Sequence, residues 1–131
     1  QVTIDVEERG TVSLRADFHW MCEAISNILK NCVEHAPAHT TVHASYVDNP
    51  LYAELLISDE GPGFSSDDLT HLFDRFYQGR GSVAGATGLG LSFARQLVEA
   101  QNGTIAAENL PAGGALFEIR IYRHPIVTLH S

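Results

Sequence analysis

The chain has 131 residues, 44% of them apolar, and a formal net charge of −8. That length suits one domain with one hydrophobic core, and the apolar fraction is ordinary for a soluble globular protein. The negative charge argues against broad binding to nucleic acid, because affinity for a phosphate backbone depends on clustered Lys and Arg.

The N-terminal half predicts strands and one long helix. Alternating or β-branched residues predict strands over Val2–Val6, Thr11–Ala16, Thr40–Val47 and Tyr52–Ser58, the first two as a hairpin. Apolar residues at helical spacing predict a helix from Phe18 to about Glu34. Asp17 would cap its start, and Pro37 would stop it. The apolar residues at 53–57 indicate a central strand buried on both faces.

The C-terminal half predicts two more helices. Ser65, with an acidic residue three positions later, is typical of an N-cap and opens a short helix that ends near Phe73. A second long helix is predicted from about Leu89 to Gln101, followed by a C-cap at Asn102–Gly103.

The remaining segments complete one domain over residues 1–131. Strands are predicted at Thr104–Glu108 and Ala115–Tyr122, and residues 123–131 as a tail. Residues 78–87 are rich in Gly and Ala without an apolar period, which predicts a mobile loop. This order of elements favours an α+β fold built as a two-layer sandwich.

The sequence also bears on the cellular compartment. No apolar run approaches the roughly 20 residues of a membrane span, and the N-terminus is strand-like rather than a signal peptide. On one helix Cys22 and Cys32 would be about 15 Å apart, too far for a disulfide, and we expect both as small buried residues in a reducing compartment. We therefore expect a cytoplasmic domain, and any inner-membrane anchor of the parent protein would lie outside these residues.

A second, polar stripe runs along the first long helix. It contains Asn27 and Asn31, one turn apart in mid-helix, where asparagine is locally unfavourable. The stripe is either an ordinary solvated face or a binding surface. The next polar cluster, Asp59 with Gly61 and Gly63, follows a strand and is either a simple acidic turn or a place where backbone approaches a ligand closely.

Aromatic residues and glycines mark two further segments. Phe73 has the spacing of a core residue, whereas Phe76 and Tyr77 stand where they could anchor the start of the 78–87 loop. The glycine-rich segment Gly85–Leu91 opens a helix, and a helix start binds anions through unpaired N–H groups and a partial positive charge.

In this order, the segments Asn27–Ala36, Asp59–Phe64, Leu72–Tyr77 and Gly85–Leu91 resemble the N, G1, F and G2 boxes of the ATP-binding domain of sensor histidine kinases. The resemblance implies the GHKL (Bergerat) fold: a mixed β-sheet with helices on one face, ATP between the helices, and a lid, here 78–87. It implies ATP and Mg²⁺ as cofactors.

The resemblance also implies roles for single residues. Asn31 would coordinate Mg²⁺, with Asn27 as its partner one turn earlier, and a carbonyl oxygen suits this hard cation. His35 would lie near the adenine and ribose. Asp59 would accept a hydrogen bond from the adenine 6-amino group. The ATP site would further include Gly61, Gly63, Phe76, Tyr77, Arg80, Thr87, Gly88, Leu89, Gly90 and Leu91.

The implied reaction is transfer of the γ-phosphoryl group to a histidine on a separate dimerisation domain of the same protein, with a response regulator as the next partner. None of the chain's seven histidines has the family's acceptor setting, so we expect ATP binding, a monomeric isolated domain, and no efficient self-phosphorylation.

Two alternatives stay open. An anti-sigma-factor-type serine kinase of the same superfamily is disfavoured by the Phe73–Tyr77 segment. A nucleotide-binding regulatory module without transfer activity is kept open by Glu34 and Gln78, which stand where the family commonly has cations. A chaperone- or topoisomerase-type ATPase fits less well, because the surroundings of Glu23 do not match those of a water-activating base.

Overall fold

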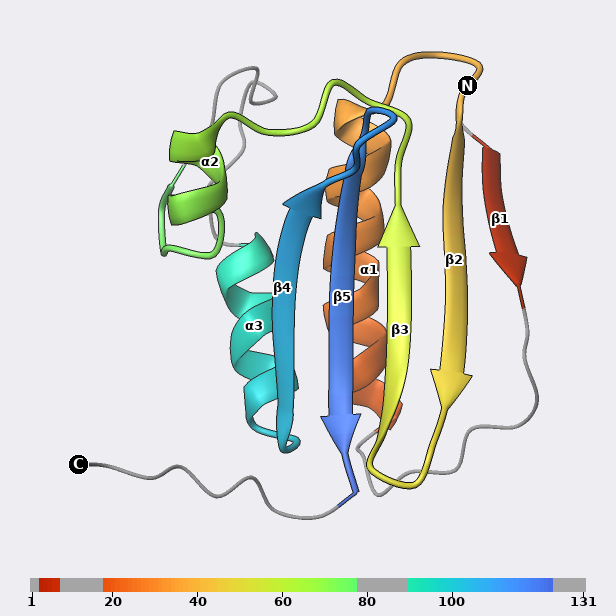
Figure 1. The fold of residues 1–131 in the computed structure, drawn as a ribbon. Helices are drawn as coiled ribbons and strands as arrows, with labels where there is room; N and C mark the ends of the chain where they lie inside the picture. Colours follow the sequence, from red (N-terminus) through yellow and green to blue (C-terminus); the bar gives the residue numbers. More distant parts are fainter. Residues whose placement is uncertain (1–2, 8–17, 78–89, 124–131) are drawn as a thin grey trace.

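The computed structural model describes residues 3–7, 18–77 and 90–123 (Figure 1). The elements in chain order are β1 (Thr3–Glu7), α1 (Phe18–His35), β2 (Thr41–Asp48), β3 (Tyr52–Ser58), α2 (Ser66–His71), α3 (Gly90–Glu99), β4 (Gly103–Asn109) and β5 (Ala115–Tyr122).

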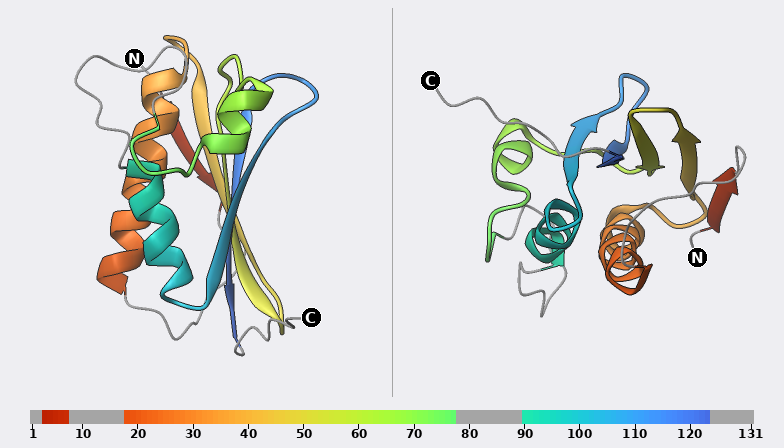
Figure 2. Two further views of the ribbon diagram at one scale, coloured as in Figure 1. Left: turned by 90° about the vertical axis from the view of Figure 1, so that its left-hand side faces the viewer. Right: turned by 90° about the horizontal axis from the view of Figure 1, so that it is seen from below.

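The strands form one mixed sheet in the order β1-β2-β3-β5-β4. β1 runs parallel to β2, and the other neighbouring pairs are antiparallel. α1 and α3 lie side by side against one face of this sheet, and no helix of the described residues covers the other face (Figure 2). The prediction of an α+β, two-layer fold with a mixed sheet and helices on one face is confirmed.

The core lies between the two helices and the sheet. β5 supplies every second residue to it, including Phe117 and Ile119, because side chains alternate between the faces of a strand. α1 contributes Ile28 and Cys32, which are four residues apart and therefore lie on the same face of the helix, and α3 contributes Ala94. The long helices are therefore amphipathic, as the helical spacing of their apolar residues predicts.

The expectation that β3 is buried on both faces is wrong. Ala53 and Ile57 face the helices and are buried, whereas Glu54 and Leu56, on the opposite face, are only partly buried. Glu54 instead accepts a 2.7 Å hydrogen bond from Nε of Arg120 on β5. A run of apolar residues predicted a strand in the middle of the sheet, which is correct, but only one layer of helices packs on it.

Capping residues in the sequence correctly predict the start of α2 and the end of α3. Oγ of Ser65 accepts a 3.1 Å hydrogen bond from the Asp68 amide and caps α2. α3 is followed by Asn102, whose φ of 62° is the left-handed conformation of a C-cap. Both caps confirm the predictions from sequence.

Some predictions lie outside the described residues. Strand 11–16, and therefore the N-terminal hairpin, is among them, as are the 78–87 loop and residues 124–131 of the tail. Within the described part of the chain, no helix has both the length and the apolar character to cross a membrane.

Candidate functional site

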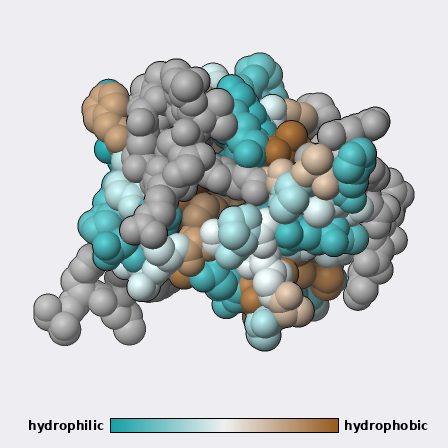
Figure 3. Space-filling view, turned by 90° about the horizontal axis from the view of Figure 1, so that it is seen from above, coloured by the Kyte–Doolittle hydropathy of each residue, from teal (hydrophilic) through white to brown (hydrophobic). Residues whose placement is uncertain are grey.

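The predicted site residues that the structure describes gather at one end of the molecule. β3 ends there, beside the C-terminal half of α1, and α3 begins lower on the same side (Figure 1). Figure 3 views the molecule from this end, where apolar residues lie between hydrophilic ones. The described parts of the four motifs thus come from segments far apart in the sequence and lie toward this end of the sheet.

Asn31 carries an unpaired acceptor. Its Oδ1 is buried and has no hydrogen-bond partner among the described residues. Leaving a buried acceptor unsatisfied costs about 1–3 kcal/mol. A bound group with a donor or a cation would remove that cost, so this oxygen fits a ligand site.

Asn27 faces the start of α3. A Cβ built on Gly90 would lie 3.5 Å from Oδ1 of Asn27, while Nδ2 of Asn27 donates to the Glu23 carbonyl at 3.0 Å. The amide oxygen thus points toward the N-terminal end of α3. The two motifs predicted to bind phosphate and metal are in van der Waals range of each other.

Asp59 is the buried acid of the site, with 4% of its surface exposed. Its Oδ1 accepts hydrogen bonds from the amides of Gly61 at 2.9 Å and Ala115 at 3.2 Å. Its own amide donates to the Ala115 carbonyl at 3.0 Å. A buried carboxylate held in this way keeps one orientation and has acceptor capacity left for a ligand.

Cys32 joins α1 to Asp59. The thiol is completely buried and lies close to the carboxyl of Asp59. Burial first, and then the charge and hydrogen bond of Asp59, raise the pKa of the Cys32 thiol to about 12. Cys32, the residue after Asn31, therefore places a neutral thiol beside the buried carboxyl of Asp59.

The glycine at 114 permits a tight contact beneath the site. A Cβ on Gly114, whose φ is 91°, would stand 2.0 Å from the Asp59 carbonyl oxygen. Only glycine allows the β4–β5 turn to approach the end of β3 so closely.

Phe73, Phe76 and Tyr77 have different surroundings. Phe73 packs edge-to-face on Phe117 of the core, with ring centroids 6.3 Å apart, as expected. Tyr77 donates a 2.5 Å hydrogen bond to Asp68. Phe76 is 62% exposed, and the Arg75 guanidinium lies 4.8 Å from its ring centroid.

Of the predicted site, the described part includes Asn27, Asn31, Asp59, Gly61, Gly63, Phe76, Tyr77, Gly90 and Leu91. Leu91 is a buried core residue of α3 rather than a surface one. Outside the described part lie the His35 side chain, Arg80, Thr87, Gly88 and Leu89.

No three His, Cys, Asp or Glu side chains of the described ranges converge as a metal site. A metal at Asn31 would then depend mainly on phosphate and water oxygens.

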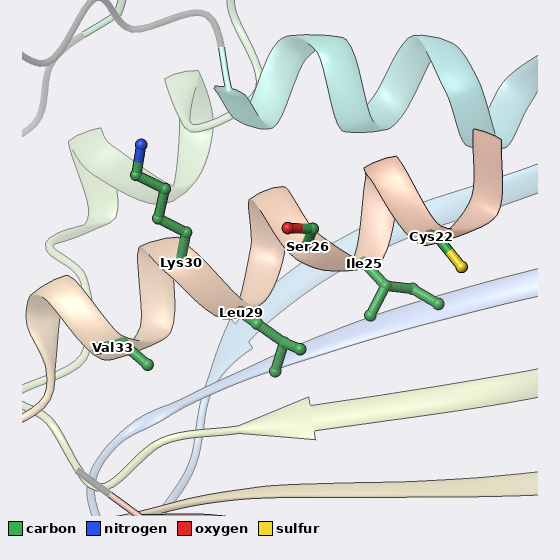
Figure 4. Close-up of a pocket in the computed structure, with 6 residues that line it drawn as sticks. All are labelled: Cys22, Ile25, Ser26, Leu29, Lys30 and Val33. Carbon is green, nitrogen blue, oxygen red and sulfur yellow. The ribbon is translucent and has the colours of Figure 1, made fainter. Parts of the chain in front are cut away.

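A separate groove of about 550 Å³ lies along α1 (Figure 4). Its lining consists of Cys22, Ile25, Ser26, Leu29, Lys30 and Val33. Ile25, Leu29 and Val33 point away from α3 in Figure 4, and none of Asn27, Asn31 and Asp59 lines the groove. The groove is therefore distinct from the candidate site.

Residues 16–125 match the model of the family described as histidine kinase-, DNA gyrase B- and HSP90-like ATPases. The chain belongs to this ATPase family. The match covers most of the chain and includes every predicted site residue. The family's description names ATPases, which implies ATP binding.

Individual relatives agree with the family. The signal transduction histidine-protein kinase AfsQ2 of Streptomyces coelicolor is 32% identical over 124 residues, which cover 93% of this chain and 23% of that protein. The sensor protein SphS of Synechococcus elongatus is 34% identical over 131 residues, 92% of this chain and 31% of that protein. The chain thus spans less than a third of these curated relatives.

Solved structures share the fold. The mycobacterial sensor histidine kinase MprB superposes with a TM-score of 0.83 at 23% identity, over 95% of this chain and 86% of that chain. The catalytic domain of the histidine kinase ThkA gives a TM-score of 0.81 at 21% identity, over 95% and 82%. The α+β arrangement described here is therefore that of histidine kinase catalytic domains.

Sequence reasoning missed the parts of the candidate site that come from the β4–β5 hairpin. Ala115 binds both the amide and the carboxyl of Asp59, yet nothing in its identity signals this contact. Cys32 was interpreted only as a small buried residue. The paired glycines before Ala115 were the available signal, since consecutive glycines often mark a close backbone approach.

Proposed function

We propose that this chain is the ATP-binding catalytic domain of a sensor histidine kinase, which presents Mg-ATP for phosphoryl transfer to a histidine on a separate dimerisation domain of the same protein. The observation that carries the proposal is the buried, unpaired Oδ1 of Asn31, together with the buried Asp59 carboxyl that two backbone amides hold in place. Family membership and the histidine kinases among the relatives support the same function.

The chemistry of the two side chains assigns them separate tasks. Asp59, held by backbone amides, accepts a hydrogen bond from the adenine 6-amino group, and it disfavours guanine, which presents a carbonyl at that position. Asn31 offers a neutral oxygen to a divalent cation. When bound with ATP, Mg²⁺ neutralises charge on the phosphates and orients them.

The start of α3 completes the proposed site. Gly90 leaves its helix end open beside Asn27, so phosphate oxygens can approach N–H groups that have no intrahelical partner. Residues 78–87 would serve as the lid, and Arg80 and Thr87–Leu89 would contact phosphate. The response regulator would receive the phosphoryl group from the dimerisation domain, and the isolated ATP-binding domain would be monomeric.

Calorimetric titration with ATP, with and without Mg²⁺, tests these assignments. Asn31→Ala should weaken binding mainly when Mg²⁺ is present, because the substitution removes a metal ligand. Asp59→Asn should weaken binding in both conditions, because an amide nitrogen can take the place of an acceptor oxygen. Ser26→Ala, an exposed position on the same helix, should bind like the unaltered chain.

The metal assignment and the proposed function can be contradicted by different results. Unchanged affinity and unchanged Mg²⁺ dependence in Asn31→Ala would remove the metal assignment. Lack of ATP binding by the unaltered chain would remove the proposed function altogether.

A further inference from the structure

The loop that follows β3 is fastened at both ends to the hairpin of β4 and β5. At its first residue, Asp59 exchanges hydrogen bonds with Ala115, the first residue of β5. At its far end, the side chain of Asn109, the last residue of β4, binds the backbone of Phe64. The glycines that were predicted to approach the nucleotide lie between these two attachments.

Asn109 uses both halves of its amide. The Phe64 amide donates to Oδ1 at 2.8 Å, and Nδ2 donates to the Phe64 carbonyl at 2.7 Å. One donor and one acceptor presented side by side imitate the edge of a β-strand. The pattern also fixes which amide atom is oxygen, because the Phe64 N–H can only donate. A carboxylate of the same shape could accept from Phe64 but could not donate to it.

The approach of Asn109 is close enough to account for Gly63. The φ of Gly63 is 78°, and a Cβ there would stand 2.7 Å from Oδ1 of Asn109. A side chain at this position would be strained by its backbone and would also displace the Asn109 amide. The glycine therefore serves the contact with Asn109, whether or not a nucleotide also approaches it.

Phe64, whose backbone Asn109 holds, also packs against the core. Its ring meets Phe117 of β5 edge-to-face, with centroids 6.1 Å apart. Ser65, the cap of α2, follows directly. A shift of the Phe64 backbone would thus disturb the loop back to Asp59 on one side and the start of α2 on the other.

We propose that Asn109 is a positioning residue for adenine recognition: by holding Phe64 it sets the path of the loop that begins at Asp59 and so maintains the preference for adenine over guanine nucleotides. The proposal rests on the proposed function, since the base is the ligand that Asp59 would select. Asn109 itself need not touch the nucleotide.

The test measures dissociation constants for ATP and GTP by calorimetry on the unaltered chain and on Asn109→Ala and Asn109→Asp. The preference for ATP should fall in Asn109→Ala by up to about ten-fold, which is the most that the loss of one or two hydrogen bonds can transmit to the difference between the two nucleotides. It should fall further in Asn109→Asp, because the new carboxylate faces the Phe64 carbonyl with no hydrogen to share.

Asn49→Asp is the matched control. Oδ1 of Asn49 accepts from the amides of Leu51 and Tyr52, both at 2.9 Å, in the β2–β3 turn at the other end of the sheet. A carboxylate preserves these bonds and adds the same charge, so the ratio of the GTP and ATP dissociation constants should not change. Thermal melts identify the temperatures at which each variant is fully folded.

The outcomes separate this proposal from the proposed function. If the unaltered chain fails to bind ATP, both are overturned. If it binds ATP in preference to GTP and the folded Asn109 variants keep the same ratio with only a lower melting temperature, Asn109 has a stabilising role alone and this proposal is overturned.

Discussion

The hydroxyl of Tyr77 donates a 2.5 Å hydrogen bond to Oδ1 of Asp68, a buried carboxylate in α2. The His71 ring lies beside the tyrosine, with centroids 5.5 Å apart. Tyr77 directly precedes the segment predicted as the lid. This bond therefore fixes the position of the last described residue before that segment.

Replacing Tyr77 by Phe should lower the melting temperature, because the substitution leaves the buried Asp68 carboxylate without one of its donors. The change keeps the ring and therefore its contact with His71. Thermal denaturation near pH 7 measures the effect. A melting temperature equal to that of the unaltered chain would show that water replaces the hydroxyl.

The same bond predicts a loss of stability in alkali. The hydrogen bond to Asp68, followed by burial and the nearby acids, raises the pKa of Tyr77 to about 12, from about 10 in an unfolded chain. The folded state then holds this proton more tightly, so its stabilisation is complete below pH 10 and is lost between about pH 10 and 12. Tyr77→Phe should lack this component, which the difference between the two pH profiles of unfolding measures.

Gly90 and Gly103 should respond oppositely to substitution by alanine. A Cβ at Gly90 finds only ordinary contact with Asn27, so Gly90→Ala should stabilise the folded chain by about 0.4–1 kcal/mol, because it reduces the entropy of the unfolded chain, while weakening Mg-ATP binding at the helix start. A Cβ at Gly103 would stand 2.6 Å from the Arg120 carbonyl oxygen, so Gly103→Ala should destabilise by about 1–3 kcal/mol.

Urea denaturation and calorimetric titration measure the two effects of Gly90→Ala independently. The informative result is a more stable domain that binds Mg-ATP less well. A variant that gains stability and binds normally would remove Gly90 from the phosphate site.

The two cysteines should differ in reactivity by about 10³-fold or more at pH 8. Cys22 is exposed, whereas the pKa of the buried Cys32 thiol is raised to about 12, and the thiolate is the reacting form. A chromogenic disulfide reagent should label one thiol quickly and the second only as the protein unfolds. Cys22→Ser should abolish the fast reaction, and equal rates for both thiols in the unaltered chain would contradict the buried contact with Asp59.

The sequence by itself determined most of the secondary structure and the identity of the main site residues. These signals are local: apolar periods gave α1 and α3, the serine at 65 gave the start of α2, and Asn102 gave a helix end. The resemblance then placed Asn31 and Asp59 in one site because their motifs occur in a fixed order. The order of the motifs along the chain can be recognised without knowing how the chain packs.

Only the tertiary structure decided what surrounds those residues. Asp59 is held by Ala115, which lies 56 positions later, and Phe64 by Asn109, 45 positions later. Such pairs depend on the register of β5 against β3 and on the path of one hairpin, which no local period encodes. The same holds for β3: its apolar run predicts burial, but whether one or two layers cover a strand is decided by where the helices pack.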